Sequence, residues 1–244
     1  MTVYREVLGF RPLELDLHLP TGPGPHPAIV YLHGGGWRRG SRRTTIPATL
    51  CPTLAERGFA VAAADYRLSG EARFPAQLAD VRAAITWLRS EVDCAATFLW
   101  GESAGAHLAL LAALDGGDVD GVVAWYPPTD LLGLPGDVAS SGGGTDDSRE
   151  TDLLGVAPSA DPDRARAASP LTLAHRNAPP ILLMHGDADD LVPPAQSERL
   201  ASALRAVGAP VELDLVPGAR HMWTDARDVG AIVDRSVQFL RALG

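Results

Sequence analysis

A serine lies at the centre of the sequence Gly-Glu-Ser-Ala-Gly, with a glycine two residues to either side of Ser103. An apolar run at 97–101 precedes it and predicts a strand, and the pattern at about 104–114 predicts a helix. The flanking glycines permit a sharp strand-to-helix turn that presents the serine hydroxyl above the carboxyl end of a sheet. Ser103 is therefore either a nucleophile on such a turn or a small residue at the start of a buried helix.

A serine hydroxyl is a poor nucleophile at its ordinary pKa, so it needs a general base. Among the seven histidines, His221 follows an expected strand at 211–216, in a loop that can reach the same end of the sheet. His107 lies four residues after Ser103 on one helix face and is interpreted as structural. The other histidines are assigned to edge strands, loops and strand ends: His18, His26, His33, His175 and His185. We predict that His221 accepts the serine proton.

A histidine base works with a carboxylate that fixes its tautomer and stabilises its charged form. The sequence HGDADDLVP begins at the end of an expected strand, 180–185, and contains Asp187, Asp189 and Asp190. The chain order Ser, Asp, His is the one expected of this strand arrangement. Spacing alone does not choose among the three aspartates.

Three consecutive glycines occur in YLHGGGW, residues 31–37, directly after another expected strand. Because glycine has no side chain, the backbone N–H groups there can approach a ligand closely. Such donors, aimed at the oxygen of a reacting carbonyl, are each worth about 10²–10³ in the rate of acyl transfer. The glycines alone are equally typical of a plain turn, but the four elements in this order favour acyl-transfer chemistry.

These residues have to be positioned by an α/β arrangement. Segments 3–9 and 12–19 predict an antiparallel strand pair, because leucines alternate with polar residues in the second. Six further apolar runs predict strands buried on both faces: AIVYLHG, FAVAAADYR, TFLWGE, GVVAWYP, PILLMHG and VELDLVPG. Helical patterns at 75–92, 193–208 and about 225–243 lie between or after them. We predict an α/β fold with a mostly parallel eight-stranded sheet and helices on both faces.

One segment interrupts this alternation. The connection at about 130–170 is too long for a simple link between elements, and such insertions are usually lids or binding loops. We expect a short lid-like insertion here, with its glycine- and serine-rich part, 139–145, mobile; the alternative is a disordered excursion. No repeat or linker is evident, so a single domain over 1–244 is expected.

The composition excludes several classes of function. The formal net charge is −9, which disfavours nucleic acid as a partner. All 21 basic residues are arginine, which excludes a Schiff-base lysine, a serine–lysine dyad and a P-loop lysine. Cys51 and Cys94 form neither a disulfide framework nor a zinc pattern, so we expect no metal and no cofactor.

The location of the protein is also an expectation from sequence. The N-terminus has no signal-peptide pattern, and no apolar run is long enough to span a bilayer. We therefore expect a soluble cytoplasmic protein with no membrane partner. Its oligomeric state, monomer or homodimer, is left open.

Seven motifs are spread over nearly the whole chain: HGGGW, DYRLS, GESAG, WYPPTDL, ARAASPLTL, HGDADDLVP and VPGARH. Together they resemble the α/β-hydrolase fold. Within it, they resemble the bacterial carboxylesterases near the hormone-sensitive lipase group and the small feruloyl- and acetylxylan-type esterases. The resemblance implies Ser103 as nucleophile, Asp189 as the acid and His221 as the base. It gives Asp65 and Arg67 a structural role in a salt-bridged turn.

The same resemblance implies an oxyanion hole formed by the N–H groups of Gly35, Gly36 and Ala104. It also implies an esterase that cleaves carboxylic esters of small molecules, with short acyl chains, through an acyl-enzyme. Hydrolysis of an N-formyl amide, as in arylformamidases, is an alternative, and so is a non-hydrolytic biosynthetic or ligand-binding role. Since the longer N-terminal cap of the hormone-sensitive lipase group is lacking, a more open pocket is expected.

Two groups of side chains border the expected catalytic loops. The first is aromatic and consists of Trp37, Trp125, Tyr126 and Trp223. These rings either wall a pocket for the substrate or pack in the core. The second is the set of arginines at 38, 39, 42 and 43, which either meets a carboxylate on the substrate or forms a solvated basic loop.

Overall fold

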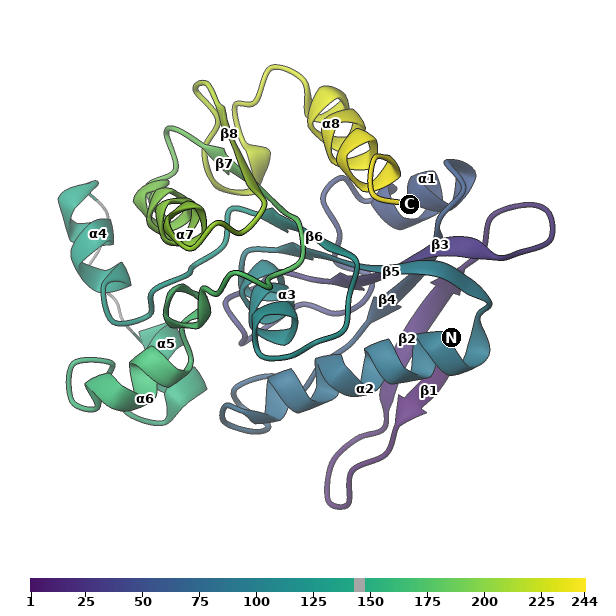
Figure 1. Cartoon of the computed structure of the whole chain (residues 1–244). Coiled ribbons are helices and arrows are strands. Elements are labelled where there is room, and N and C mark those ends of the chain that lie inside the picture. Colours follow the sequence, from purple (N-terminus) through teal and green to yellow (C-terminus); the bar gives the residue numbers. More distant parts are fainter. Residues whose placement is uncertain (143–147) are drawn as a thin grey trace.

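The fold is built on one eight-stranded sheet, seen in the computed structural model, which describes residues 1–142 and 148–244 (Figure 1). The strands are β1 (Thr2–Arg5), β2 (Leu13–His18), β3 (His26–Leu32), β4 (Ala60–Ala64), β5 (Cys94–Glu102), β6 (Gly121–Trp125), β7 (Ile181–Gly186) and β8 (Val211–Val216). They lie in the order β1-β2-β4-β3-β5-β6-β7-β8. β2 pairs antiparallel with both neighbours and every other pair is parallel, so β2 alone runs against the rest.

Helices cover both faces of this sheet. They are α1 (Leu50–Glu56), α2 (Ala76–Glu91), α3 (Ala104–Leu114), α4 (Leu134–Ser140), α5 (Ser148–Leu154), α6 (Pro162–Ala167), α7 (Ala195–Ala206) and α8 (Val229–Arg241). Side chains alternate along the central strands, so Val30 and Leu32 belong to the core layer that also contains residues of α2, α3 and α7, whereas Ile29 and Tyr31 belong to the layer that contains residues of α1 and α8. This is the α/β-hydrolase layering that the resemblance implies.

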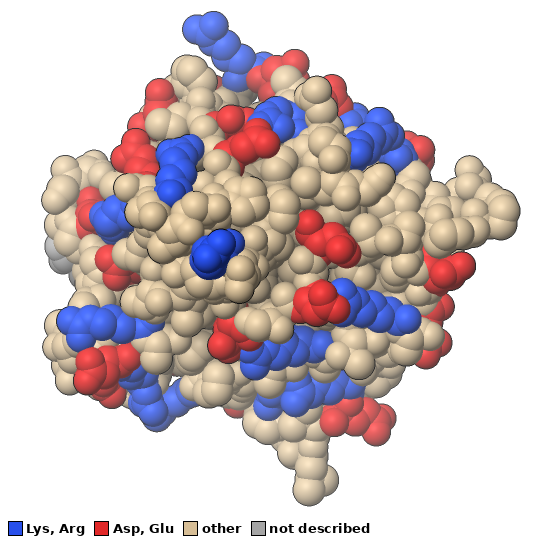
Figure 2. Space-filling model, in the orientation of Figure 1, with Lys and Arg blue, Asp and Glu red and all other residues tan. Residues whose placement is uncertain are grey.

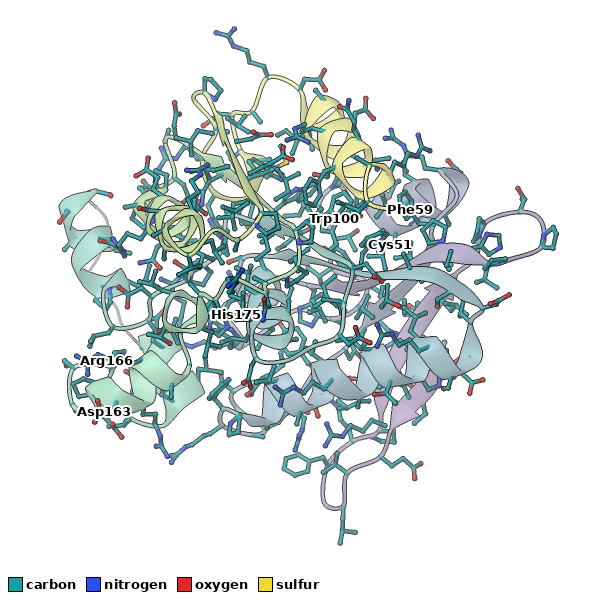
Figure 3. All side chains as sticks on the ribbon, in the orientation of Figure 1. Cys51, Phe59, Trp100, Asp163, Arg166 and His175 are labelled. Atoms are coloured by element: carbon teal, nitrogen blue, oxygen red, sulfur yellow. The ribbon has the colours of Figure 1, made fainter. Side chains whose placement is uncertain are left out.

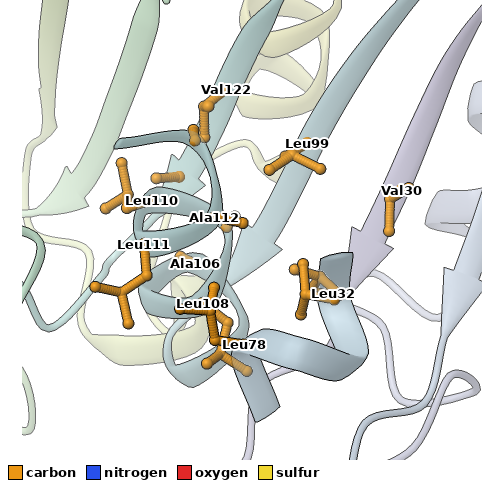
Figure 4. Packing of buried hydrophobic residues seen from close by; sticks show 14 of the residues in the cluster. Val30, Leu32, Leu78, Leu99, Ala106, Leu108, Leu110, Leu111, Ala112 and Val122 are labelled. Atoms are coloured by element: carbon orange, nitrogen blue, oxygen red, sulfur yellow. The ribbon is translucent and has the colours of Figure 1, made fainter. Parts of the chain in front are cut away.

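Helix α3 is apolar except for His107, and every one of its residues is buried. It lies between the sheet, α2 and the short 3-10 turn η1 (Pro170–Leu173), which together surround it. Figure 4 shows the packing of Leu108, Leu110 and Leu111 of α3 beside the strands that carry Leu32 and Leu99. The chain segment after Ser103 is thus held from every side, and its first turn has little freedom to move.

Two element boundaries and one strand differ from the expectations. β1 ends at Arg5, because the chain then turns through a loop in which Phe10 N–H donates to the carbonyl of Val7. The last helix begins at Val229 because the side chain of Asp228 caps it by accepting from the N–H of Ala231. β8 is partly exposed along its length, since it is the edge strand and pairs only with β7. The expectation that this strand is buried on both faces was wrong.

The expected insertion lies between β6 and β7 and contains α4, α5, α6 and η1 (Figure 1). Asp137 of α4 pairs with Arg199 and accepts from the amide of Gln196, both on α7. On α6, Arg166 pairs with Asp163 at the outer rim, where Figure 3 labels both. Part of the segment expected to be mobile, residues 143–145, lies outside the described residues; the part at 139–142 completes α4 and the turn after it.

The surface in Figure 2 carries acidic and basic side chains interspersed over the face shown. Ion pairs account for part of this mixture, for example Arg82 with Asp115 and Arg89 with Asp118. Within the described ranges, no helix combines the length and the hydropathy that a bilayer crossing requires.

Candidate active site

Ser103 lies at the junction of β5 and α3 in a strained backbone conformation. Its φ is 50° and its ψ is −115°, a region that residues with a side chain rarely occupy. Glycines make the turn possible: a Cβ at Gly101 would lie 2.4 Å from the carbonyl carbon of Gly105, and one at Gly105 would lie 2.1 Å from the carbonyl oxygen of Leu32. The N–H of Ser103 donates to the carbonyl of Trp125 at 2.9 Å. The turn is therefore fixed on both sides.

His221 connects Ser103 to a buried carboxylate. Its Nε2 lies 3.0 Å from Ser103 Oγ, and its Nδ1 lies 2.6 Å from Asp189 Oδ2. Burial raises the pKa of Asp189, but contacts with the rings of His185 and His221 outweigh burial and hold the pKa well below its usual value. The carboxylate is thus ionised and can accept from Nδ1–H, which leaves Nε2 free to accept the serine proton.

The three aspartates of HGDADD have different surroundings. Asp189 accepts from the N–H groups of Leu191 and Val192 through its other oxygen, so the loop itself orients it. Asp187 is exposed and accepts from the N–H of Gly218, and Asp190 pairs with Arg220 at the surface. Only Asp189 contacts His221, so the geometry distinguishes the three where spacing did not.

The loop after β3 passes directly beside the nucleophile. A Cβ at Gly34 would lie 3.5 Å from Ser103 Cβ, and one at Gly35, where φ is 119°, would lie 2.1 Å from the carbonyl oxygen of Arg39. Gly36 also has a positive φ, of 59°. Ala104 is the first residue of α3, where N–H groups have no acceptor within the helix. The structure therefore brings the expected oxyanion donors to the same corner of the sheet.

Two histidines outside this set, His107 and His175, contact backbone carbonyls of other segments through their rings. His107 is fully buried between Trp37, whose Nε1–H donates to its Nδ1 at 3.2 Å, and the carbonyl of Ala168, 2.8 Å from its Nε2. Burial lowers the pKa of His107 to about 4, so the ring is neutral at ordinary pH. His175, labelled in Figure 3, lies 3.1 Å from the carbonyl of Leu114 through its Nε2. The contacts of His107 agree with the prediction that this histidine has a structural role.

A cavity of about 600 Å³ opens beside Ser103 and His221. Its walls combine the glycines of the β3 loop with apolar side chains and charged side chains. The apolar ones are Ile46, Tyr126, Leu191 and Met222, and the charged ones are Arg38, Arg39, Glu102 and Arg149. Within 1–142 and 148–244, no group of three or more His, Cys, Asp and Glu side chains is arranged to hold a metal ion.

Of the four aromatic side chains proposed for the pocket, only Tyr126 lines it. Trp125 packs against Trp223 and donates its indole N–H to Ser236, and Trp37 packs on His107. This corrects the pocket assignment for the three tryptophans, which are buried and pack in the two core layers: Trp37 with the cluster of α2 and α3, and Trp125 and Trp223 with the cluster of α1 and α8. Trp223 and Tyr126 pack edge to face, and the Tyr126 ring lies against His221.

The arginines after HGGGW do not act as one group. Arg42 is mostly buried and pairs with Asp65, Glu14 and Asp16, which matches neither a solvated loop nor a substrate contact. Arg43 pairs with Asp16, whereas Arg38 and Arg39 line the cavity. Asp65 and Arg67 are both in ion pairs, as the resemblance implies, but with different partners: Asp65 with Arg42 and Arg67 with Asp80.

Glu102 and Arg149 were not singled out from the sequence. Glu102 directly precedes Ser103, and its buried carboxylate accepts from the hydroxyl groups of Tyr31 and Tyr126 and from the N–H of Ile46. Burial raises the pKa of Glu102 to about 7, although these hydrogen bonds lower it. The sequence did contain a signal for Glu102, because a carboxylate directly after an apolar run and before Ser103 is unusual. No comparable signal marked Arg149, which belongs to the insertion.

The raised pKa of Glu102 leads to a stability prediction. The folded protein holds the proton of the Glu102 carboxyl group more tightly than the unfolded chain does. The contribution of this group to the free energy of unfolding is therefore fully present below about pH 4.5 and is lost as the pH rises through about 7. Glutamine does not titrate, so replacing Glu102 by glutamine removes that loss. Relative to the wild type, the free energy of unfolding of E102Q should be higher by up to about 3 kcal/mol at pH 8 and by under about 1 kcal/mol at pH 5. Urea denaturation of both proteins at the two pH values measures this difference; an offset that does not change with pH would contradict it.

Comparison with known proteins finds one matching family and several relatives that are named as esterases. The BD-FAE family model matches residues 15–204. Esterase LipC of Mycobacterium tuberculosis is 33% identical over 228 residues, which are 83% of this chain and 54% of LipC. The chain spans about half the length of the curated relatives it matches.

Solved structures show the same fold over the full chain. A truncated carbohydrate esterase from gut microbiota superposes with a TM-score of 0.84 at 26% identity, covering 100% of this chain and 94% of that one. The propionate-bound esterase Est2 of Thermogutta terrifontis gives a TM-score of 0.81 at 25% identity, with 100% and 93% covered. By its family match and its eight-stranded architecture, the chain belongs to the BD-FAE family and has the α/β-hydrolase fold.

Proposed function

We propose that this protein is a serine hydrolase that cleaves carboxylic esters through an acyl-enzyme. The observation that carries the proposal is the continuous chain of contacts from Ser103 Oγ to His221 Nε2, and from His221 Nδ1 to Asp189, at 3.0 and 2.6 Å. The esterase relatives support the same reaction class. A ligand-binding role would not require this arrangement beside an open cavity.

In the proposed mechanism, Ser103 attacks the ester carbonyl while His221 takes its proton. The N–H groups of Gly35, Gly36 and Ala104 stabilise the negative charge that develops on the carbonyl oxygen. Asp189 stabilises the positive charge on His221 during this step. The leaving alcohol then takes the proton from His221, and a water molecule repeats the sequence on the acyl-enzyme.

A short acyl chain is the proposed preference. The cavity is about 600 Å³ and is shared between the acyl and alcohol parts of the substrate, which limits the room for a long chain. Est2 of Thermogutta terrifontis, which has the same fold, was solved with propionate bound, and propionate is a short carboxylic acid. We therefore propose acetyl to about hexanoyl esters as the substrates turned over best.

Hydrolysis rates on 4-nitrophenyl esters of two to ten carbons, measured beside N-formylkynurenine, test this function. We expect kcat/KM to be highest between two and six carbons, to fall about tenfold or more by ten carbons, and to be far lower on the formyl amide. A higher kcat/KM on N-formylkynurenine than on every ester would reassign the protein to amide hydrolysis. Failure of a fluorophosphonate to label Ser103 would rule out the covalent mechanism.

A further inference from the structure

The cavity beside Ser103 has a cationic wall. Arg38 and Arg39 reach it from the loop after β3, and Arg149 reaches it from α5 of the insertion. Among the described residues, 1–142 and 148–244, Glu102 is the one carboxylate in the same lining. These three guanidinium groups come from two segments far apart in the sequence, and they meet at the same opening in a protein whose net charge is −9.

The three arginines differ in how far nearby carboxylates neutralise them. Arg38 pairs with Asp152 at 2.9 Å, so its charge is largely balanced. Arg149 has a loose contact of 3.9 Å with Glu150, which is buried and does not line the cavity. In the described part of the chain, the side chain of Arg39 makes no ion pair or hydrogen bond, although it is exposed at the opening. Arg42, with three carboxylates around it, shows how this protein neutralises an arginine that serves only the fold.

Arg149 lies close to the reacting centre. A Cβ at Gly36 would lie 3.1 Å from Arg149 Cδ, so the arginine stem packs directly on the loop proposed to hold the oxyanion. Below neutral pH, Glu102 is mostly protonated and carries little negative charge, because burial raises the pKa of its carboxyl group to about 7. A guanidinium offers N–H groups in a planar fork that matches a carboxylate. Below neutral pH, an anion in this cavity would therefore meet these donors with little competing negative charge from Glu102.

We propose that the cavity selects esters that carry a negatively charged group, a carboxylate in the simplest case, and that Arg149 and Arg39 bind that group. The inference rests on the proposed esterase function and specifies its substrate class. The overall charge of the protein repels anions at long range, so the preference arises from these local donors and not from the general surface. The apolar side chains Ile46, Tyr126, Leu191 and Met222 hold the uncharged remainder of the substrate.

Two matched pairs of esters test the proposal and locate the charge. Mono-4-nitrophenyl adipate against 4-nitrophenyl hexanoate places a carboxylate on the acyl part, and 3-butyryloxybenzoate against phenyl butyrate places it on the alcohol part. In at least one pair, we expect the wild-type kcat/KM to be higher for the anion. The anion-to-neutral ratio should fall about tenfold in Arg149→Met and in Arg39→Met, the size of effect expected from losing one charged hydrogen bond. It should fall less in Arg149→Lys, which keeps the charge.

Arg176→Met is the matched control, since Arg176 is exposed and outside the cavity lining, and its ratio should equal that of the wild type. Raising the salt from 0.05 to 0.5 M should lower the wild-type ratio, because ions screen the attraction. A ratio below one in both pairs, or a ratio unchanged in both cavity variants, overturns the proposal. If none of the four esters is hydrolysed, the esterase function itself fails; normal turnover of the neutral esters without anion preference defeats only the present inference.

Discussion

Replacing Ser103 by alanine is expected to lower kcat for ester hydrolysis by about 10⁶-fold, because it removes the atom that would bond to the acyl group. The fold should persist. The change deletes only the hydroxyl, whose hydrogen-bond partner is His221 Nε2, and leaves the backbone bond from Ser103 N–H to Trp125 in place. Steady-state hydrolysis of 4-nitrophenyl butyrate and the thermal midpoint Tm of both proteins measure the two halves of the prediction.

Ser90→Ala provides the matched control, since Ser90 is exposed near the end of α2 and bonds only within its own neighbourhood. It should retain the wild-type rate and should still be labelled by a fluorophosphonate, whereas Ser103→Ala should not be labelled. Comparable turnover in the wild type and the Ser103→Ala variant would show that another group carries the reaction.

Changing Asp189 to asparagine is expected to lower kcat by about 10⁴-fold with little change in structure. An asparagine oxygen can still accept from the N–H groups of Leu191 and Val192, so the loop should keep its shape. The amide carries no charge, and its NH₂ group facing His221 Nδ1 favours the tautomer that has a proton on Nε2. That tautomer cannot accept the proton of Ser103.

The same loop supplies two controls of identical chemistry. Asp187→Asn and Asp190→Asn change carboxylates whose partners are Gly218 and Arg220 at the surface, so each should keep kcat within about threefold of the wild type. The three variants are compared by kcat on one ester and by Tm. If Asp187→Asn or Asp190→Asn loses more activity than Asp189→Asn, the acid has been assigned to the wrong residue.

The parallel sheet, the order along the chain of the loops that carry Ser103, Asp189 and His221, and the start of α3 could all be anticipated, because they depend on local patterns. Apolar runs separated by helical periodicity indicate parallel strands, and glycines at 101 and 105 indicate the turn at Ser103. The position of β8 at the edge could not be anticipated. Strand order is set by pairing between distant segments, so an apolar run looks the same whether it has one neighbour or two.

The cavity wall was the least predictable part for the same reason. Trp37 and Trp125 stand next to catalytic loops in the sequence, yet a shift of one residue along a strand or turn moves a side chain from the loop edge into the core. Glu102 obtains its setting from Tyr31, Ile46 and Tyr126, which lie on other elements. Contacts between residues so far apart in the sequence produce no local pattern from which they could be predicted.

The insertion between β6 and β7 has a consequence for how this protein can change over generations. The groups proposed to break the bond are carried at the ends of β5, β7 and β8, whereas Arg149 is carried by α5, a separate piece of chain fastened to the body by pairs such as Asp137 with Arg199 and Arg38 with Asp152. If Arg149 binds the substrate as proposed, substitutions in that piece alter which molecules fit, while Ser103, His221 and Asp189 remain on other elements. On this proposal, selectivity is carried in part by a segment separate from the elements that hold the proposed reacting groups, so a change confined to that segment can alter preference while those groups stay in place.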